Sequence, residues 1–257
     1  MRSMFNHNNT SAARGFTLIE MLVVAPLLIL LIGTMIAYLS SLTGTGLKAN
    51  AQLAMAYDTQ EALNDMGAYS SLATALLAST STLPNGQGSD NSTAAFTATT
   101  SSKPDTLIIQ IPATDKSSLD PARSLIYTGA SPCDTSASTL KYLLVYFVGT
   151  DNSLYKRTIV PYPTGTSGCA TPYQRNSCSP SNMTPSVCQA RDEKLLDNVS
   201  TLSVVYYKDD GVTATTPDQA SNAEVTIAAS QAVSDSTISY SGSLRIRAIN
   251  YKTNTSP

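Results

Sequence analysis

The chain has 257 residues, a formal net charge of −2 and only 13% charged residues, about half of the roughly 25% found in ordinary soluble domains. This charge gives no strong positive field to attract nucleic acid, and the length suits one sizeable domain or two small ones. The polar residues are mainly Ser, Thr, Asn and Gln, which suits a surface outside the cytoplasm. The only histidine is His7.

An apolar segment near the N-terminus, Phe16–Tyr38, contains Glu20 as its only charged residue. As a helix it would be about 34 Å long, enough to cross the hydrocarbon core of a bilayer. Arg2 and Arg14 precede it without any acidic residue, which predicts a cytoplasmic N-terminus and an exported remainder. In an ordinary secretory signal the small residue of the cleavage site follows the apolar run, whereas Gly15 precedes it here. Cleavage after Gly15 would leave the helix on the mature protein as an anchor.

Residues 14–20, RGFTLIE, followed by an uninterrupted apolar run, resemble the class III signal of type IV prepilins and pseudopilins. The resemblance implies that a prepilin peptidase cuts between Gly15 and Phe16 and that the new N-terminal Phe16 is methylated. It also implies partners: membrane lipid, an assembly platform, and other pilin or pseudopilin subunits that pack through the N-terminal helix.

Glu20 needs a physical explanation, because an unpaired carboxylate in hydrocarbon is costly. Cleavage would create an amine on Phe16, four positions earlier and therefore on the same helix face. Glu20 can pair with this amine or with that of a neighbouring subunit, and in pilins the pairing between subunits sets the register of addition. The alternative is that Glu20 extends to the cytoplasmic headgroups without a partner. Pro26 removes one helical hydrogen bond and is expected to kink the helix.

Residues 40–78 are expected to continue as an amphipathic helix. Apolar residues recur there at three- and four-residue spacing and predict a face that packs on a sheet: Leu63, Met66, Ala73 and Leu77. The acidic residues fall mostly elsewhere and are expected to be solvated: Asp58, Glu61 and Asp65. Gly44 and Gly46 mark either a flexible joint or a weak stretch of continuing helix. Residues 79–104, rich in Ser and Thr, predict a long surface loop too polar to pack in a core.

Residues 105–257 predict a disulfide-containing antiparallel β domain. Short β-rich runs bounded by turn residues lie at 106–112, 123–129, 139–149, 153–160, 195–211, 223–230 and 240–250. Thr150-Asp151-Asn152, between two of these runs, predicts a hairpin. One long helix followed by such a sheet is the order found in pilins, and the fold class is α+β. Residues 142–160, 195–211 and 243–250 loosely resemble larger minor pilins of the PilW kind and J-type minor pseudopilins.

The four cysteines, Cys133, Cys169, Cys178 and Cys188, predict two disulfides in an oxidising compartment. A zinc site is the alternative, but zinc sites usually contain a closely spaced cysteine pair. Of the three possible pairings, proximity favours Cys178–Cys188 with Cys133–Cys169. The proline-rich stretch 161–191 is then an irregular excursion held by disulfides.

Few residues point to catalysis. Removal of the leader would leave no histidine, which excludes Ser-His-Asp and Cys-His catalysis and histidine metal sites. Asp209-Asp210-Gly211 predicts a turn. Thirteen tyrosines fit half-buried strands better than a contact surface, and the pairs Lys156-Arg157 and Arg245/Arg247 are too sparse for a DNA-binding patch. We expect no enzyme, no cofactor and no metal.

The sequence therefore favours a minor pilin-like structural subunit of a type IV pilus or of a type II secretion-like pseudopilus, with an initiating or tip role. Residues 1–15 would be the leader and 16–39 the membrane and assembly helix. The precursor would lie in the cytoplasmic membrane, with the mature domain outside the cytoplasm. The alternative is a fibre-borne binding module whose disulfide region, 133–188, binds a surface ligand or DNA. A membrane-anchored enzyme is disfavoured by the missing histidine.

Overall fold

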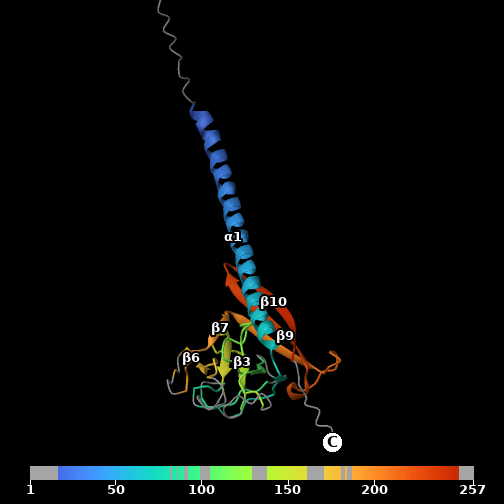
Figure 1. Cartoon of the computed structure of the whole chain (residues 1–257). Coiled ribbons are helices and arrows are strands. Elements are labelled where there is room, and N and C mark those ends of the chain that lie inside the picture. Colours follow the sequence, from blue (N-terminus) through green and yellow to red (C-terminus); the bar gives the residue numbers. More distant parts are fainter. Residues whose placement is uncertain are drawn as a thin grey trace, which may run out of the picture. The chain divides into compact units, whose positions relative to one another are not determined.

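The computed structural model describes residues 17–81, 83–84, 86–89, 92–98, 105–128, 138–160, 171–180, 183 and 187–248. One long helix precedes a set of mainly antiparallel strands (Figure 1), which confirms the predicted α+β class. The chain divides into two compact units, Met1–Ala49 and Asn50–Pro257, and the helix α1 (Leu18–Ser70) runs through the boundary between them.

Helix α1 continues without interruption past Pro26, Gly44 and Gly46 and ends at Ser70. The prediction that it extends to residue 78 is therefore wrong. Ser70 and Ser71 donate their hydroxyls to carbonyls one turn earlier, at 3.1 and 2.7 Å, and such bonds compete with helix continuation. The chain then pairs with a strand, since the Thr74 N–H donates to the Gln110 carbonyl at 2.7 Å.

A five-stranded antiparallel sheet follows the order β1-β2-β3-β4-β7. Its strands are β1 (Ala75–Leu76), β2 (Leu107–Pro112), β3 (Lys141–Val148), β4 (Leu154–Ile159) and β7 (Glu193–Leu196). The hairpin predicted at Thr150-Asp151-Asn152 is confirmed, and Asn152 adopts the left-handed conformation that the turn requires, with φ 57°. The strand predicted over 123–129 is wrong. Leu125 and Tyr127 form single bridges to two different segments and no continuous ladder.

A second sheet has the order β10-β9-β8, formed by β8 (Val199–Tyr207), β9 (Asn222–Val233) and β10 (Ser236–Arg247). The predicted single strand over 195–211 is thus two strands, because Asn198 has φ 58° and the chain leaves one sheet for the other there. Two short elements, β5 (Ser177–Cys178) and β6 (Ala190–Arg191), pair in parallel, and η2 (Pro217–Gln219) is a 3-10 turn. Asp105 joins the sheets: its N–H donates to Leu202 O and its carboxylate accepts from Val204 N.

The last turns of α1 pack on β10 (Figure 1). Leu63 and Met66 are fully buried, which confirms the apolar face predicted for them. A Cβ at Gly242 on β10 would lie 2.9 Å from Leu63 Cδ1, so the glycine permits the close approach of helix and strand. On β8 the predicted alternation is also confirmed, with Val204 and Tyr206 buried and Val205 exposed.

The central strand β3 is different, because five successive residues, Tyr142–Tyr146, are buried. Successive side chains of a strand point to opposite faces, so both faces of this sheet are covered. The Ser/Thr-rich loop, residues 79–104, covers one of these faces and contributes the buried side chains of Leu83 and Phe96. The prediction that residues 79–104 are too polar to pack is therefore wrong for its described part. The loop also buries Ala98, Thr80 and Gln87, so a segment that is polar overall still packs.

Candidate functional site

Glu20 lies in the first turn of α1, next to the predicted processing site; Gly15 and Phe16 themselves lie outside the described residues. The Glu20 carboxylate accepts hydrogen bonds from the backbone N–H and the hydroxyl of Thr17, both at 2.9 Å. In return the Glu20 N–H donates to the Thr17 hydroxyl at 3.3 Å. This reciprocal arrangement is a capping box, which starts a helix by satisfying its first N–H groups. Glu20 therefore has a local partner in addition to the predicted amine.

The helix that follows Glu20 is long and apolar enough to cross a membrane, with a mean hydropathy of 2.6 in its most apolar window. Its large apolar residues between Leu18 and Leu42 are all exposed within the chain. Leu18 is 84% exposed and Ile29 72%. Exposed apolar surface on this scale requires an apolar environment or partner. Pro26 lies inside this stretch, and its predicted kink stays a prediction.

A buried lysine, Lys156 on β4, holds an ion network on the sheet face that α1 covers. Its ammonium lies 2.8 Å from Asp65 on α1 and 2.8 Å from Glu193 on β7, and 4.5 Å above the ring of Tyr69. Burial alone would lower the pKa of Lys156, but the hydrogen bonds to the two carboxylates outweigh it and raise this pKa. Asp65 was expected on the solvated helix face; it is instead an ion-pair partner. The Tyr146 hydroxyl donates to it at 3.1 Å.

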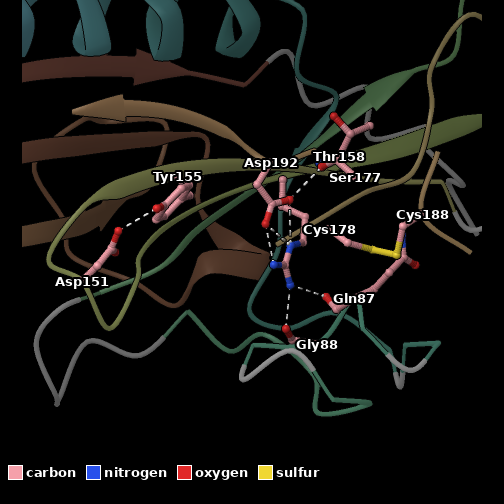
Figure 2. Close-up of polar contacts among 10 residues, drawn as sticks. Gln87, Gly88, Asp151, Tyr155, Thr158, Ser177, Cys178, Cys188 and Asp192 are labelled. Carbon is pink, nitrogen blue, oxygen red and sulfur yellow. Dashed lines mark hydrogen bonds and ion pairs between the residues drawn. A yellow bond between two sulfur atoms is a disulfide. The ribbon is translucent and has the colours of Figure 1, made fainter. Parts of the chain in front are cut away.

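The next residue of β4, Arg157, points to the other sheet face and is 1% exposed. Its guanidinium donates to both carboxylate oxygens of Asp192, with Nε at 3.0 and 3.1 Å, and to the carbonyls of Gln87 and Gly88 at 2.9 and 2.7 Å. Figure 2 shows Asp192 and the two carbonyls converging on this point, with Ser177 donating to Asp192. This set, named the Arg157 clasp, joins β4 to the Ser/Thr-rich loop and to the disulfide segment.

The predicted disulfide Cys178–Cys188 is present, with both cysteines buried (Figure 2). It is directly connected to the Arg157 clasp, because the Asp192 N–H donates to the Cys178 carbonyl at 2.8 Å. Cys133 and Cys169 lie outside the described residues, so their predicted pairing is not tested.

A cleft of about 420 Å³ lies on the Lys156 face of the sheet, next to the last turn of α1. We name it the Tyr69 cleft. It is lined mainly by aromatic, hydroxyl, amide and charged side chains from six segments: Tyr69, Ser117, Ser118, Tyr142, Leu144, Lys156, Thr158, Tyr173, Gln174, Arg175, Ser177, Ala190, Arg191 and Glu193. Because α1 ends at Ser70, the sheet beyond it is left open to form the floor of this cleft.

The other acidic residues considered in the sequence lie on the protein surface. Asp209-Asp210-Gly211 is a turn, as predicted, in which Asp210 accepts bonds from the N–H groups of Val212 and Thr213. These bonds and the one from the Thr213 hydroxyl, the largest cause, lower the pKa of Asp210 to about 2. Asp58 and Glu61 are exposed on α1. Among the residues that the structure describes, no three His, Cys, Asp or Glu side chains gather as metal ligands.

The Lys156 network, the Arg157 clasp and the Tyr69 cleft were not predicted from the sequence. Their partners are far apart along the chain, as with Asp65 and Lys156, and no local pattern relates them. One signal was available. Two adjacent cations inside a strongly apolar hairpin must point to opposite faces, and a buried cation requires a carboxylate partner.

No protein-family model, curated protein or solved structure matches this chain. The likeness of residues 14–20 to a class III prepilin signal therefore remains a prediction from the residues themselves. The looser likeness of residues 142–160, 195–211 and 243–250 to larger minor pilins and pseudopilins remains one too.

Proposed function

We propose that this chain is a minor pilin-like subunit, cut between Gly15 and Phe16 and assembled through its N-terminal helix into a type IV pilus or a type II secretion-like pseudopilus. The observation that supports this most is the combination of RGFTLIE with one helix that is apolar and exposed near its start and buried against a β domain near its end. Such a helix suits a subunit that is first held by lipid and then packed among other helices. An initiating or tip position, an extracytoplasmic β domain, a prepilin peptidase and an assembly platform belong to the same proposal.

Processing is tested by changing the glycine before the cut. Gly15→Val should abolish cleavage, so that the chain keeps its leader and runs at the precursor position on a denaturing gel. The matched control is Gly33→Val in the apolar helix, since nothing lies within 4 Å of a Cβ added there. The proposal fails if Gly15→Val and wild type run alike.

Assembly is tested at Glu20, and the capping box with Thr17 makes the choice of variant important. Glu20→Gln removes the negative charge but can still form a capping box, whereas Glu20→Val removes both. If an amine is the partner that assembly needs, both variants are cleaved normally and both are lost from sheared fibres. If Glu20→Gln enters fibres as wild type does, capping suffices and the charge-pairing role is refuted.

The second candidate is a fibre-borne binding module that uses the disulfide region 133–188. The observation that favours it is the Tyr69 cleft, because Tyr173, Gln174, Arg175 and Ser177 of this region line it. Deletion of residues 161–176 should then abolish attachment or DNA uptake while fibres persist. Loss of the fibres themselves would instead assign this region to the scaffold.

A further inference from the structure

We infer that the Tyr69 cleft binds an acidic saccharide, a sugar chain that carries carboxylates. This inference does not depend on assembly into a fibre, so its failure would leave the proposed subunit role standing. A volume of about 420 Å³ lies within the range of about 300–1,000 Å³ that is usual for small-molecule sites.

The floor of the cleft is held by side chains that already have partners. The Tyr142 hydroxyl lies 2.7 Å from the Ser118 hydroxyl, and the Gln174 amide donates to Ser118 at 3.1 Å and to Thr114 at 2.8 Å. Gln174 also accepts from the Thr114 N–H at 3.0 Å. A floor with this network is preorganised, so a ligand would not have to pay the entropy of ordering it.

The charge of the rim points to an anion. Lys156 is neutralised by Asp65 and Glu193 at 2.8 Å each. Arg175 and Arg191, in contrast, form no ion pair with any carboxylate in the part of the chain that the structure describes. One nitrogen of Arg175 donates to the Pro172 carbonyl at 2.7 Å, which orients its guanidinium. Two arginines of this kind match carboxylates, which guanidinium groups bind in a bidentate manner.

The aromatic and hydroxyl groups of the cleft match a sugar ring. Tyr173 is 57% exposed, and its ring has a negative face that attracts the weakly positive C–H face of a pyranose. Ser117 and Thr158 line the same space and can exchange hydrogen bonds with sugar hydroxyls.

Glu193 favours a saccharide over single-stranded DNA. It also lines the cleft, and its side chain is 59% exposed. A carboxylate accepts hydrogen bonds from sugar hydroxyls. Every ring of a saccharide carries such hydroxyls, whereas the sugars inside a DNA chain carry none. A carboxylate and two arginines in one cleft therefore fit a ligand with both hydroxyl donors and a negative group.

The test uses the full chain in detergent micelles and isothermal titration calorimetry. The probe is trigalacturonic acid, and its fully methyl-esterified form is the neutral control with the same sugar rings. We expect the acid to bind at least about tenfold more tightly than the ester, because only the acid accepts charge-assisted hydrogen bonds from the two arginines. Tenfold corresponds to about 1.4 kcal/mol. Equal binding of acid and ester, or no binding of the acid, overturns the inference.

Two variants localise the site. Arg191 and Tyr173 are exposed, so Arg191→Ala and Tyr173→Ala should fold normally, and each should weaken binding of the acid about tenfold. Arg247→Ala removes an exposed arginine on β10 that does not line the cleft and should leave binding unchanged. Wild-type affinity in the first two variants overturns the inference. So does tighter binding of an oligothymidylate than of the acid, which would make the cleft a DNA site.

Discussion

Removal of one partner of the Arg157 clasp should destabilise the β domain strongly. The side chains of Arg157 and Asp192 are 1% and 2% exposed, and Ser177 also donates to Asp192. Asp192→Ala would leave a guanidinium buried without its carboxylate. Loss of one partner of a buried ion pair costs about 3–5 kcal/mol. For a domain of about 150–250 residues this corresponds to a fall in Tm of about 6–20 °C.

The assay is unfolding of the full chain in detergent, by urea and by heat, followed by circular dichroism. The matched control is the exposed pair Lys194–Asp197, whose side chains are 49% and 57% exposed. Lys194→Met should change the stability little, because exposed ion pairs contribute little. If Asp192→Ala is no more destabilising than Lys194→Met, the clasp does not stabilise the domain and the reasoning is refuted.

A double variant separates loss of attraction from exposure of an unpaired charge. Arg157→Met with Asp192→Leu removes both charges and keeps apolar volume, so no buried charge remains without a partner. We expect the double variant to be more stable than Asp192→Ala alone, since buried pairs replaced by apolar residues are often close to neutral. A double variant less stable than the single one would contradict this expectation and show that the hydrogen bonds from Arg157 to the Gln87 and Gly88 carbonyls outweigh the cost of burying its charge.

Two further predictions concern the same domain. Replacing both Cys178 and Cys188 by Ser opens a loop of ten positions and should cost about 3 kcal/mol, measured by the urea midpoint; a midpoint equal to that of the wild type under oxidising conditions would contradict it. The hydrogen bond from Tyr155 to the Asp151 carboxylate (Figure 2) raises the pKa of Tyr155 from 10.0 to about 12. Its stabilising effect should be complete below pH 10 and be lost as the pH rises to about 12. Tyr155→Phe should therefore flatten the loss of stability over this interval, and an unchanged pH profile would refute the assignment.

Features of the fold were predictable where they depend on residues close together in the sequence. The hairpin at Thr150-Asp151-Asn152 was predictable because these turn residues separate two β-rich runs, and Asn152 takes the left-handed conformation there. The burial of Leu63 and Met66 followed from helical spacing. The apolar exposed stretch of α1 followed from hydropathy alone.

The missed features depend on contacts between distant segments. The end of α1 at Ser70 is favoured by the hydroxyl bonds of Ser70 and Ser71 and by the pairing of Ala75–Leu76 with β2, and helical spacing reveals neither. The Ser/Thr-rich loop is packed because Phe96 covers the outer face of β3, near Phe147 at 5.0 Å between ring centroids. Prediction of the Tyr69 cleft would have required both the end of α1 and the packing of the loop. The cleft forms where the helix ends over a sheet whose other face is already covered.

The central claim is that the apolar helix begins a mature protein and is not a signal to be removed. Mass spectrometry of the N-terminal peptide, from chain extracted from membranes of a host with a prepilin peptidase, tests this most directly. The account predicts a peptide that begins at Phe16 and is one methyl group heavier than its sequence. An N-terminus at Met1, or one beyond Tyr38 after loss of the apolar helix, would contradict it.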